Sequence, residues 1–504
     1  MSYLGEFENT GRTMFDYMRI YRSTFYGNAY AYGRKKRELF LFLKDVDNVA
    51  GSFVRMGIKA GDNIAMCLPN IPQALVTLYA ANRIGATVSV IYPKSNPEVF
   101  KSQLNLTNPK ICLLCEVNYF KYKKLLGNVK AVLCPIFGGK FYGLKKTAKF
   151  TPYHSDGNDV AIFMHSSGTT GAPKTSMLTN KNINALVYNM LKTLGNPYDE
   201  RCSMFAVLPV FHGFGLAATI HSSMCTRMTL CLVPSFNAAK SLKIIKKNNV
   251  TCMNVIPNML AKMVRQKNFG ECLKSVKHIY VGGDSLGEEL TKEAHTLLEK
   301  AGSKAKIIQG YGLTEMGSVC TLNLSGDKFG SIGKPLVGVD LKLLKDGREV
   351  GVDEIGEMCF SGEQLMCGYL GDSDVFFETD GKRYLRSGDL ASMDEDGYLY
   401  FKGREKRLIK ISGINVFPTE IERVVNSVEE VENSCAICRY QGKKPYVHLI
   451  VELKGDALID DDLSKKIIGT IKANLSHWNV PKTIEQIDEM PITDMGKLDY
   501  KYFN

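Results

Sequence analysis

The stretch FMHSSGTTGAPKTSMLTN, residues 163–180, follows the apolar run DVAIFM and is rich in glycine, serine and threonine. Its Gly168, Lys174 and Thr175 match the nucleotide-phosphate loop GxxxxGK[ST], but Pro173 stands at the second glycine. A phosphate loop of that kind cradles its ligand with successive backbone N–H groups, and proline has no N–H and a fixed φ angle. The pattern therefore argues against a kinase or nucleoside triphosphatase.

What remains is a hydroxyl- and glycine-rich loop with one lysine. Such a loop can clamp the β- and γ-phosphates of a nucleotide while the chemistry occurs at the α-phosphate. Read alone, the segment also fits a mobile serine/glycine linker. The residues expected to contact phosphate are Ser166, Ser167, Gly168, Thr169, Thr170, Gly171 and Lys174.

A second glycine motif, GFGLAA at residues 213–218, matches the GxGxxA pattern of dinucleotide-binding folds. That pattern needs an acidic residue about twenty positions further on to bind the ribose. No Asp or Glu occurs between Gly213 and Gly270. The sequence therefore excludes a dinucleotide site here.

Around both motifs, apolar strand-like runs alternate with amphipathic helical ones from about residue 45 to 400. This alternation predicts an α/β fold with mainly parallel sheets, whose ligand loops lie at the carboxyl ends of strands. Short antiparallel strands with tight turns are expected within residues 330–400. The predicted domains are 1–405, with a small antiparallel β subdomain at about 328–405, and a small mobile α+β domain at 406–504.

The length and composition indicate what kind of protein this is. A chain of 504 residues with 45% hydrophobic content is expected to form two or more globular domains. No run of 18 apolar residues occurs, and the acidic N-terminus lacks a signal-peptide core, so a cytoplasmic location is expected. Fourteen cysteines follow no regular framework, and the pairs Cys112/Cys115 and Cys435/Cys438 lie in strand-like runs. Residues three apart on a strand point to opposite faces, so buried structural thiols are expected rather than a metal site.

The net charge of +12 is compatible with an anionic ligand, a membrane surface or nucleic acid. The lysines read as dispersed along the chain, which favours a solvated basic surface. We expect no nucleic-acid partner, and weak peripheral contact with anionic lipid stays open.

Further segments follow the loop in a fixed order. They are LPVFHGFGL, YVGGDSL, QGYGLTEMG, GEMCFSGEQLMCGYL, YLRSGDLASMDEDGYLYFKGREKRLIKISGINVFPTEIE and PITDMGKLDY. Together with SSGTTGAPK they resemble the adenylate-forming superfamily of acyl-CoA synthetases, aryl-CoA ligases, luciferases and peptide-synthetase adenylation domains. The match spans most of the chain and looks most like a bacterial fatty acyl-CoA synthetase.

The resemblance implies that a carboxylate attacks the α-phosphate of ATP, giving acyl-AMP and pyrophosphate, and that the thiol of CoA then displaces AMP. Mg²⁺ would be held by Thr170 and Glu315. Lys497 would reach the reacting carboxylate, Lys406 would be the hinge of the C-terminal domain, and Gly413 would line the thiol tunnel.

The resemblance also implies the nucleotide contacts. Tyr311 would stack on the adenine opposite Gly283 and Asp284, Asp389 would bind both ribose hydroxyls, and Arg404 would support the ribose and phosphate. The remaining candidates are Gln309, Gly310, Gly312 and Thr314 in the adenine segment and His212, a catalytic candidate in the acyl-site motif. Read alone, Asp389 also fits a turn residue, Lys497 a surface lysine and His212 a buried core histidine.

Three departures from the family pattern stand out. Thr175 replaces a glycine after the lysine, His165 occupies a position usually held by an aromatic residue or threonine, and Asp284 is unusually acidic for the adenine segment. A hydroxyl at 175 is not disabling, and only the backbone of Asp284 needs to touch the base.

The substrate is expected to be a carboxylic acid with an alkyl or aryl tail. Relatives that activate amino acids place an aspartate near the acyl motif and a proline in the adenine segment, but here no acid flanks LPVFHGFGL and Leu313 replaces the proline. The expected pocket walls are Phe211, His212, Phe214, Asn254, Val255, Ile256, Gly282, Gly310 and Gly312.

Three hypotheses stay open: a medium- or long-chain fatty acyl-CoA ligase, an enzyme that loads an acyl or aryl group onto a carrier-protein thiol, and a non-catalytic protein of this fold. The intact Lys174, Glu315, Asp389, Arg404 and Lys497 favour the enzymes. The oligomeric state is not predicted.

Overall fold

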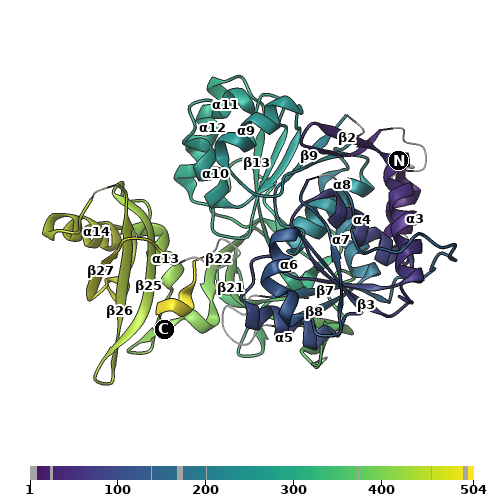
Figure 1. The fold of residues 1–504 in the computed structure, drawn as a ribbon. Coiled ribbons are helices and arrows are strands. Elements are labelled where there is room, and N and C mark those ends of the chain that lie inside the picture. Colours follow the sequence, from purple (N-terminus) through teal and green to yellow (C-terminus); the bar gives the residue numbers. More distant parts are fainter. Residues whose placement is uncertain are drawn as a thin grey trace.

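The computed structural model describes residues 8, 10–22, 27–137, 139–166, 174–199, 201–372, 374–455, 457–491 and 498–503. Figure 1 shows a large body built from the N-terminal four-fifths of the chain and a smaller unit beside it built from the last hundred residues. The fold is mixed α/β, as the alternating pattern predicts.

A seven-stranded sheet carries the loop with which the sequence analysis began. Its β7 and the four strands beyond it are mutually parallel, and β8 runs antiparallel to both of its neighbours, β7 and β19. The apolar runs DNIAMCLP, ATVSVIYP, ICLLCEV and DVAIFMH form strands here, which confirms their prediction. The spatial order is β19 (Gly368–Tyr369), β8 (Thr175–Thr179), β7 (Val160–His165), β4 (Thr87–Val90), β3 (Asn63–Cys67), β5 (Ile111–Leu114) and β6 (Lys130–Leu133).

A nine-stranded sheet packs beside it and is parallel from β13 to β1. Its central strands come from RCSMFAVLP, MTLCLVP, CMNVIP, HIYVGG and KIIQGYG, again as predicted. The order is β15 (Lys334–Pro335), β14 (Val319–Leu322), β13 (Lys306–Gly312), β12 (His278–Val281), β11 (Cys252–Val255), β9 (Ser203–Ala206), β10 (Thr229–Leu232), β1 (Asn28–Tyr32) and β2 (Lys35–Glu38).

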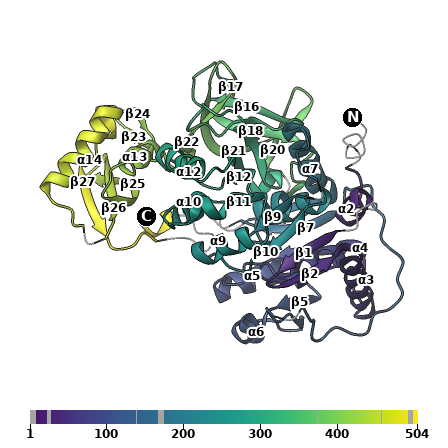
Figure 2. The ribbon, with the colours of Figure 1, turned by 90° about the horizontal axis from the view of Figure 1, so that it is seen from above.

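Helices cover and separate these sheets (Figure 2). The helix at Pro72–Arg83 is buried from its first residue to Asn82, and its buried Gln73 and Asn82 form hydrogen bonds within the core. The helices and short helical turns of the large body are α2 (Met14–Arg22), α3 (Leu39–Arg55), α4 (Pro72–Arg83), α5 (Pro97–Thr107), α6 (Glu116–Tyr122), η1 (Lys123–Leu125), α7 (Asn180–Leu194), η2 (Phe214–His221), α8 (Ser222–Cys225), α9 (Ala238–Lys247), α10 (Pro257–Val264), α11 (Phe269–Cys272), α12 (Glu288–Lys300) and η3 (Thr314–Met316).

The antiparallel strands predicted within residues 330–400 form a third sheet. Two short strands of this region, β15 and β19, join the parallel sheets instead and tie the third sheet to them. The order is β17 (Arg348–Glu349), β16 (Val339–Lys345), β18 (Gly356–Gly362), β21 (Lys382–Met393) and β20 (Phe376–Thr379), and β22 (Leu399–Arg404) also pairs with β21.

Beyond Arg404 the chain passes through a 3₁₀ turn, η4 (Glu405–Arg407), into an α+β unit with a hydrophobic core of its own. The predicted boundary near Lys406 lies in this turn and stays a prediction. Among the described residues, two ion pairs join this unit to the large body, Arg265 after α10 with Glu432 at 2.9 Å and Lys402 with Glu420 at 3.4 Å. The elements are β23 (Ile409–Ile411), β24 (Ile414–Val416), α13 (Pro418–Val425), β25 (Val431–Gln441), β26 (Lys444–Leu453), α14 (Asp461–Asn474), η5 (His477–Asn479), β27 (Thr483–Ile487) and η6 (Tyr500–Phe503).

All fourteen cysteines are free thiols, and most are buried. Cys112 lies in β5, but Cys115 lies one residue beyond it, at the start of α6, so the prediction that both belong to a strand was wrong for Cys115. Cys435 and Cys438 both lie in β25. Within the described part of the chain, no group of three or more His, Cys, Asp or Glu side chains could hold a metal ion.

Candidate active site

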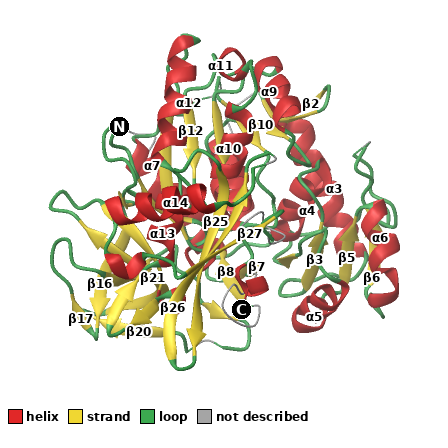
Figure 3. Ribbon diagram, turned by 90° about the vertical axis from the view of Figure 1, so that its left-hand side faces the viewer, coloured by secondary structure: helices red, strands yellow, loops and turns green. Residues whose placement is uncertain are grey.

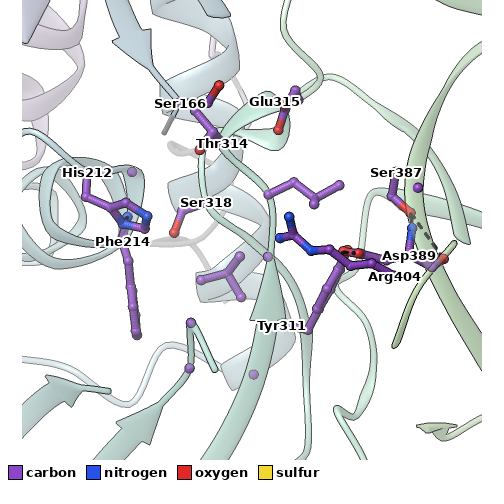
Figure 4. Close-up of a pocket in the computed structure, with 18 of the residues that line it drawn as sticks. Ser166, His212, Phe214, Tyr311, Thr314, Glu315, Ser318, Ser387, Asp389 and Arg404 are labelled. Atoms are coloured by element: carbon purple, nitrogen blue, oxygen red, sulfur yellow. Dashed lines mark hydrogen bonds and ion pairs between the residues drawn. The ribbon is translucent and has the colours of Figure 1, made fainter. Parts of the chain in front are cut away.

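A cavity of about 600 Å³ opens where β11, β12 and β13 end and the third sheet meets the two mainly parallel sheets. The carboxyl ends of parallel strands are where ligand loops were expected. Figure 4 shows His212, Phe214 and Ser318 on one side of it, Tyr311, Asp389 and Arg404 on the other, and Ser166, Thr314 and Glu315 along the top.

Twelve of the predicted site residues line this cavity, although they come from segments up to 240 positions apart in the sequence. They are Ser166, Lys174, His212, Gly283, Gly310, Tyr311, Gly312, Thr314, Glu315, Asp389, Arg404 and Lys406.

The remaining predicted residues lie elsewhere. Asp284 and Gln309 line an adjoining cavity of about 750 Å³ rather than the first one. Gly413 lies in the exposed turn between β23 and β24, at φ +84°, and lines neither cavity. The predicted contacts of Ser167, Gly168, Thr169, Thr170, Gly171 and Lys497 fall outside the described residues.

The predicted pocket walls are only partly right. Phe214, Asn254 and Gly282 line the cavity. Val255 follows Asn254 on β11 and so points to the opposite face, where it is fully buried in a separate hydrophobic cluster. Phe211 is buried and packs its ring against Tyr92, with the ring centroids 4.8 Å apart.

Asp389 is the polar centre of one side of the cavity and is 4% exposed. Its Oδ2 accepts a 2.6 Å hydrogen bond from the hydroxyl of Tyr311, and its Oδ1 lies 3.4 Å from Nε of Arg404. Asp389 and Arg404 face each other across the β21–β22 ladder, so two strands fix their relative position. Burial, and then the charge of Asp389, raises the pKa of Tyr311 well above its ordinary value, so the phenol stays a neutral donor.

The part of β21 before Asp389 is held by a carboxylate that the sequence analysis did not single out. Glu357 accepts a 2.9 Å hydrogen bond from the backbone N–H of Gly388 and a 2.6 Å bond from Arg386. Ser387 Oγ accepts the N–H of Asp389 at 3.0 Å and donates to the carbonyl of Met358 at 2.6 Å. These contacts fix the backbone on which Asp389 is carried.

Glycines let the strand ends of the adenine segment approach closely. A Cβ at Gly312 would lie 1.9 Å from the carbonyl oxygen of Ser318, and one at Gly282 would lie 2.9 Å from that of Gly310. Gly283 has a φ of +89°, a conformation that side chains disfavour. Only glycine fits these close backbone approaches and this φ angle without a shift of the neighbouring chain. The ring of Tyr311 lies beside these glycines and packs on Phe360, with the ring centroids 6.0 Å apart.

Glu315 and Lys174 meet through Tyr369, a residue that the sequence analysis quoted in GYL without assigning it a role. The Tyr369 hydroxyl donates to Oε1 of Glu315 at 2.6 Å, and Lys174 Nζ lies 4.3 Å from the Tyr369 ring centroid. Burial, and then the charge of Glu315, raises the pKa of Tyr369, so the phenol stays a donor. No local signal in the sequence links Tyr369 to Glu315, which lies 54 positions away.

The phosphate-loop candidate connects two antiparallel strands, since His165 of β7 pairs with Thr175 of β8. The N–H of Ser166 donates to the carbonyl of Lys174 at 2.9 Å, which closes the base of the loop. A GxxxxGK[ST] loop leads from a strand into a helix, whereas this loop leads into a second strand. The geometry is therefore a second argument, besides Pro173, against the phosphate loop of a kinase or nucleoside triphosphatase.

His165 at the base of this loop is held from both sides, by Ser89 at 2.9 Å and Thr175 at 2.8 Å. Burial lowers its pKa to about 4, so the ring is neutral near pH 7. The departure from the family pattern at 165 is therefore accommodated by a neutral, hydrogen-bonded imidazole.

The other side of the cavity is mainly apolar. GFGLAA, rejected as a dinucleotide motif, instead starts a π-helix, η2, a rare element that often marks functional sites. Nδ1 of His212 accepts the N–H of Phe214 at 3.2 Å, which leaves Nε2 to carry the proton of the neutral ring. Further lining comes from Met190, Phe214, Val281, Val319 and Leu322.

These motifs belong to a known family. The sequence profile described as AMP-binding enzyme matches residues 41–370. The chain belongs to the AMP-binding enzyme family. The resemblance drawn from the motif order is thereby confirmed.

Curated relatives of this AMP-binding enzyme match nearly end to end. The chain is 28% identical to a 2-succinylbenzoate–CoA ligase of Bacillus licheniformis, over 92% of this chain and 94% of that protein. It is also 28% identical to a long-chain-fatty-acid–CoA ligase of Salmonella typhimurium, over 88% and 85% of the two chains. An o-succinylbenzoate CoA synthetase of Bacillus subtilis, solved with ATP and magnesium, shares the fold with a TM-score of 0.85, 23% identity and coverage of 96% and 98%.

The second cavity of this AMP-binding enzyme lies between the large body and the C-terminal unit. Leu498 and Tyr500, next in the described chain after Lys497, line it together with Gly283 and Asp284. Tyr500 packs on the guanidinium of Arg407 at 3.5 Å, and Arg407 donates to Glu422 at 2.6 Å. Burial raises the pKa values of Glu422 and Tyr500, and the charge of Asp284 adds a smaller contribution, so the acidic departure at Asp284 faces the C-terminal unit.

Among the described residues, no helix has the length and apolar character that crossing a membrane requires.

Proposed function

We propose that this AMP-binding enzyme is an ATP-dependent acid–thiol ligase of the cytoplasm. A carboxylate oxygen of the substrate attacks the α-phosphorus of ATP and the bond to pyrophosphate breaks, giving acyl-AMP. The sulfur of CoA then attacks the acyl carbonyl carbon, the bond to AMP breaks, and the thiol proton passes to solvent. The two CoA ligases that match the chain along its length support this reaction class.

The observation that carries the proposal is the joining of two polar clusters in one cavity. Tyr311, Asp389 and Arg404 form one cluster, and Lys174 and Glu315 meet at Tyr369 in the other. We assign adenine stacking to Tyr311, the ribose hydroxyls to Asp389 and the phosphates to Arg404 and Lys174. A non-catalytic protein would not need to keep both clusters.

Mg²⁺ would be held by Glu315, whose carboxylate lines the cavity and offers the oxygen ligands that this ion prefers. Because the described residues contain no cluster of three metal-ligating side chains, the remaining ligands would be phosphate oxygens and water. The predicted ligand Thr170 lies outside the described residues. When bound, the ion supplies charge neutralisation on the phosphates.

The apolar side of the cavity supports an acid with an alkyl or aryl tail. We favour a medium- or long-chain fatty acid, in line with the matching long-chain ligase. We assign His212, which lines the apolar side beside Phe214, to the neighbourhood of the reacting carboxylate. The match to the 2-succinylbenzoate–CoA ligase makes an aryl acid the second candidate for the substrate.

The C-terminal unit, residues 406–504 in our division, would rotate about Lys406 between the half-reactions. Lys497 would act in the first half-reaction and Gly413 in the second. The exposed position of Gly413 fits a residue that enters the site only after rotation.

The decisive experiment supplies purified protein with ATP, Mg²⁺, CoA and a mixed pool of fatty, aryl and amino acids, and identifies the products by mass spectrometry. One dominant acyl-CoA would establish the ligase and name its acid. Acyl-AMP that accumulates without acyl-CoA would instead establish the alternative, transfer to a carrier-protein thiol. Absence of both products would refute adenylate formation.

A further inference from the structure

Positive charge is concentrated in residues 91–150 of the chain. This segment contains eleven lysines and only two acidic residues, Glu98 and Glu116, and it has no arginine or aspartate. It therefore holds an excess of nine positive charges, while the whole chain has a net charge of +12. The lysines are less dispersed than the sequence analysis assumed.

The fold gathers this segment at one border of the seven-stranded sheet, on α5, α6, η1, the edge strand β6 and the loop after it (Figure 3). In the described part of the chain, only Lys110 of these eleven lysines has an acidic partner within ion-pair distance, Asp62 at 2.6 Å. We name this surface the basic edge. Its exposed lysines are Lys94, Lys110, Lys121, Lys123, Lys124, Lys130, Lys140, Lys145, Lys146 and Lys149.

The basic edge also exposes large apolar side chains. Val117 and Phe120 of α6 are 67% and 72% exposed, and Phe137 and Tyr142 of the loop are 82% and 53% exposed. Val117 and Phe120 are three residues apart and therefore share one face of the helix. Lys123 Nζ lies 5.5 Å from the Phe120 ring centroid, which places charge directly beside the apolar group.

The loop that carries Phe137 is anchored to its surroundings. Nε2 of the fully buried Gln73 donates to the carbonyls of Pro135 and Lys140, at 2.8 and 3.1 Å. Tyr32 donates to the carbonyl of Ile136 at 2.8 Å, and the N–H of Ile136 donates to Glu116 of α6 at 3.1 Å. Phe137 is thus held outward, beside α6.

We propose that the basic edge binds the surface of a membrane that contains anionic lipid. Lysine clusters are attracted to such a surface by about 1 kcal/mol for each lysine near it, and exposed aromatic side chains insert at the headgroup level. Nucleic acid fits less well, because bidentate recognition of phosphates and bases uses arginine, which this segment lacks. The membrane partner goes beyond the proposed reaction and does not depend on it.

The basic edge adjoins the apolar side of the cavity. The Tyr122 hydroxyl of α6 donates to the carbonyl of Ser95 at 2.6 Å, next to Tyr92, whose ring packs on Phe211. Phe211 precedes His212 of the cavity lining. Binding at the basic edge would thus bring the acyl side of the site close to the bilayer, where acids with long alkyl tails partition.

The test is flotation of the full-length protein with vesicles of phosphatidylcholine alone or of phosphatidylcholine mixed with phosphatidylglycerol. We expect binding only to the mixed vesicles, and we expect it to weaken as salt is added. The double variant Lys123→Gln/Lys124→Gln should bind about fivefold more weakly for each lysine removed. Phe120→Ser/Phe137→Ser should also weaken binding, while turnover of a short, water-soluble acid stays at the wild-type level.

Matched controls are Lys304→Gln/Lys443→Gln and Leu458→Ser, which alter exposed residues outside the basic edge and should bind as the wild type does. Equal binding to both kinds of vesicle, or equal loss in control and test variants, would overturn the proposal. The proposal would also be overturned if the protein failed to bind the mixed vesicles but bound random-sequence double-stranded DNA through Lys123 and Lys124.

Discussion

The Tyr311 hydroxyl and the Asp389 carboxylate are joined by a 2.6 Å hydrogen bond, although 78 positions separate them in the sequence. Tyr311 comes from the last parallel strand of the large body and Asp389 from the antiparallel sheet. This bond therefore ties the proposed adenine contact to the proposed ribose contact across two sheets.

Replacing Asp389 by asparagine should weaken the use of ATP about 10- to 100-fold in kcat/KM, because hydrogen bonds to a charged group are worth about 1.5–3 kcal/mol. The measurement is pyrophosphate release at varied ATP. The control is Asp340→Asn, whose carboxylate pairs with Lys382 on an exposed surface and should leave the rate unchanged. Equal ATP dependence in wild type and Asp389→Asn would remove Asp389 from the nucleotide site.

Replacing Glu315 by glutamine should raise the Mg²⁺ concentration needed for half-maximal pyrophosphate release several-fold, because a neutral amide binds Mg²⁺ more weakly than a carboxylate. Calorimetric titration with Mg·ATP gives a second readout that does not need turnover. Tyr369→Phe is the comparison, since it removes the 2.6 Å hydrogen bond but keeps the charge. If Tyr369→Phe shifts the Mg²⁺ requirement as much, then Glu315 acts by positioning Tyr369 and not as a ligand.

Replacing Lys497 by alanine should abolish most adenylate formation but spare the conversion of supplied acyl-AMP to thioester. The reason is the division of labour that the family resemblance implies, with the lysine present only in the first half-reaction. Each half-reaction is assayed separately, and Lys443→Ala serves as the control lysine of the same unit. Equal loss in both halves would contradict the alternation of the C-terminal unit.

Replacing Gly282 by alanine should select against long tails. The added Cβ would lie 2.9 Å from the Gly310 carbonyl oxygen and 3.5 Å from Cε1 of Phe214, so the apolar side of the cavity must narrow or shift. We expect kcat/KM to fall more for long acids than for short ones, measured over a series of chain lengths. A uniform fall over the series would show that Gly282 serves strand packing alone.

His165 should make the protein less stable in acid. Burial lowers its pKa from 6.5 to about 4, so folding favours the neutral ring. This stabilisation is complete above pH 6.5 and is lost as the pH falls from 6.5 towards 4, by at most about 3 kcal/mol. In urea titrations at pH 7 and pH 5, His165→Asn should lose less stability than the wild type on acidification. An equal loss would place the acid sensitivity elsewhere, for instance at His221, whose pKa burial lowers to about 3.

Local patterns predicted the strands well, because apolar runs bounded by turn residues leave few alternatives. The order of the motifs also predicted that Asp389 and Arg404 serve one site. The sequence did not indicate their pairing across β21 and β22, since strand register depends on partners far along the chain. The roles of Glu357 and Tyr369 were missed for the same reason, because their partners Gly388 and Glu315 lie 31 and 54 positions away.

Two errors had local causes. Val255 was expected in the pocket because its strand neighbours were, but alternation along β11 turns it to the other face. Cys115 was assigned to a strand because its apolar run continues past the end of β5. GFGLAA gave no sign of a π-helix, a geometry that the sequence pattern does not encode.

The Arg265–Glu432 ion pair between the large body and the C-terminal unit has a consequence for the rate of the proposed cycle. Its side chains are 55% and 28% exposed, and pairs in contact with water contribute about 1 kcal/mol or less. A pair of that strength breaks readily by thermal motion, so it would resist the proposed rotation of the C-terminal unit only weakly. We therefore expect dissolved salt, which screens partly exposed charges, to weaken this hold on the C-terminal unit and to ease the proposed rotation.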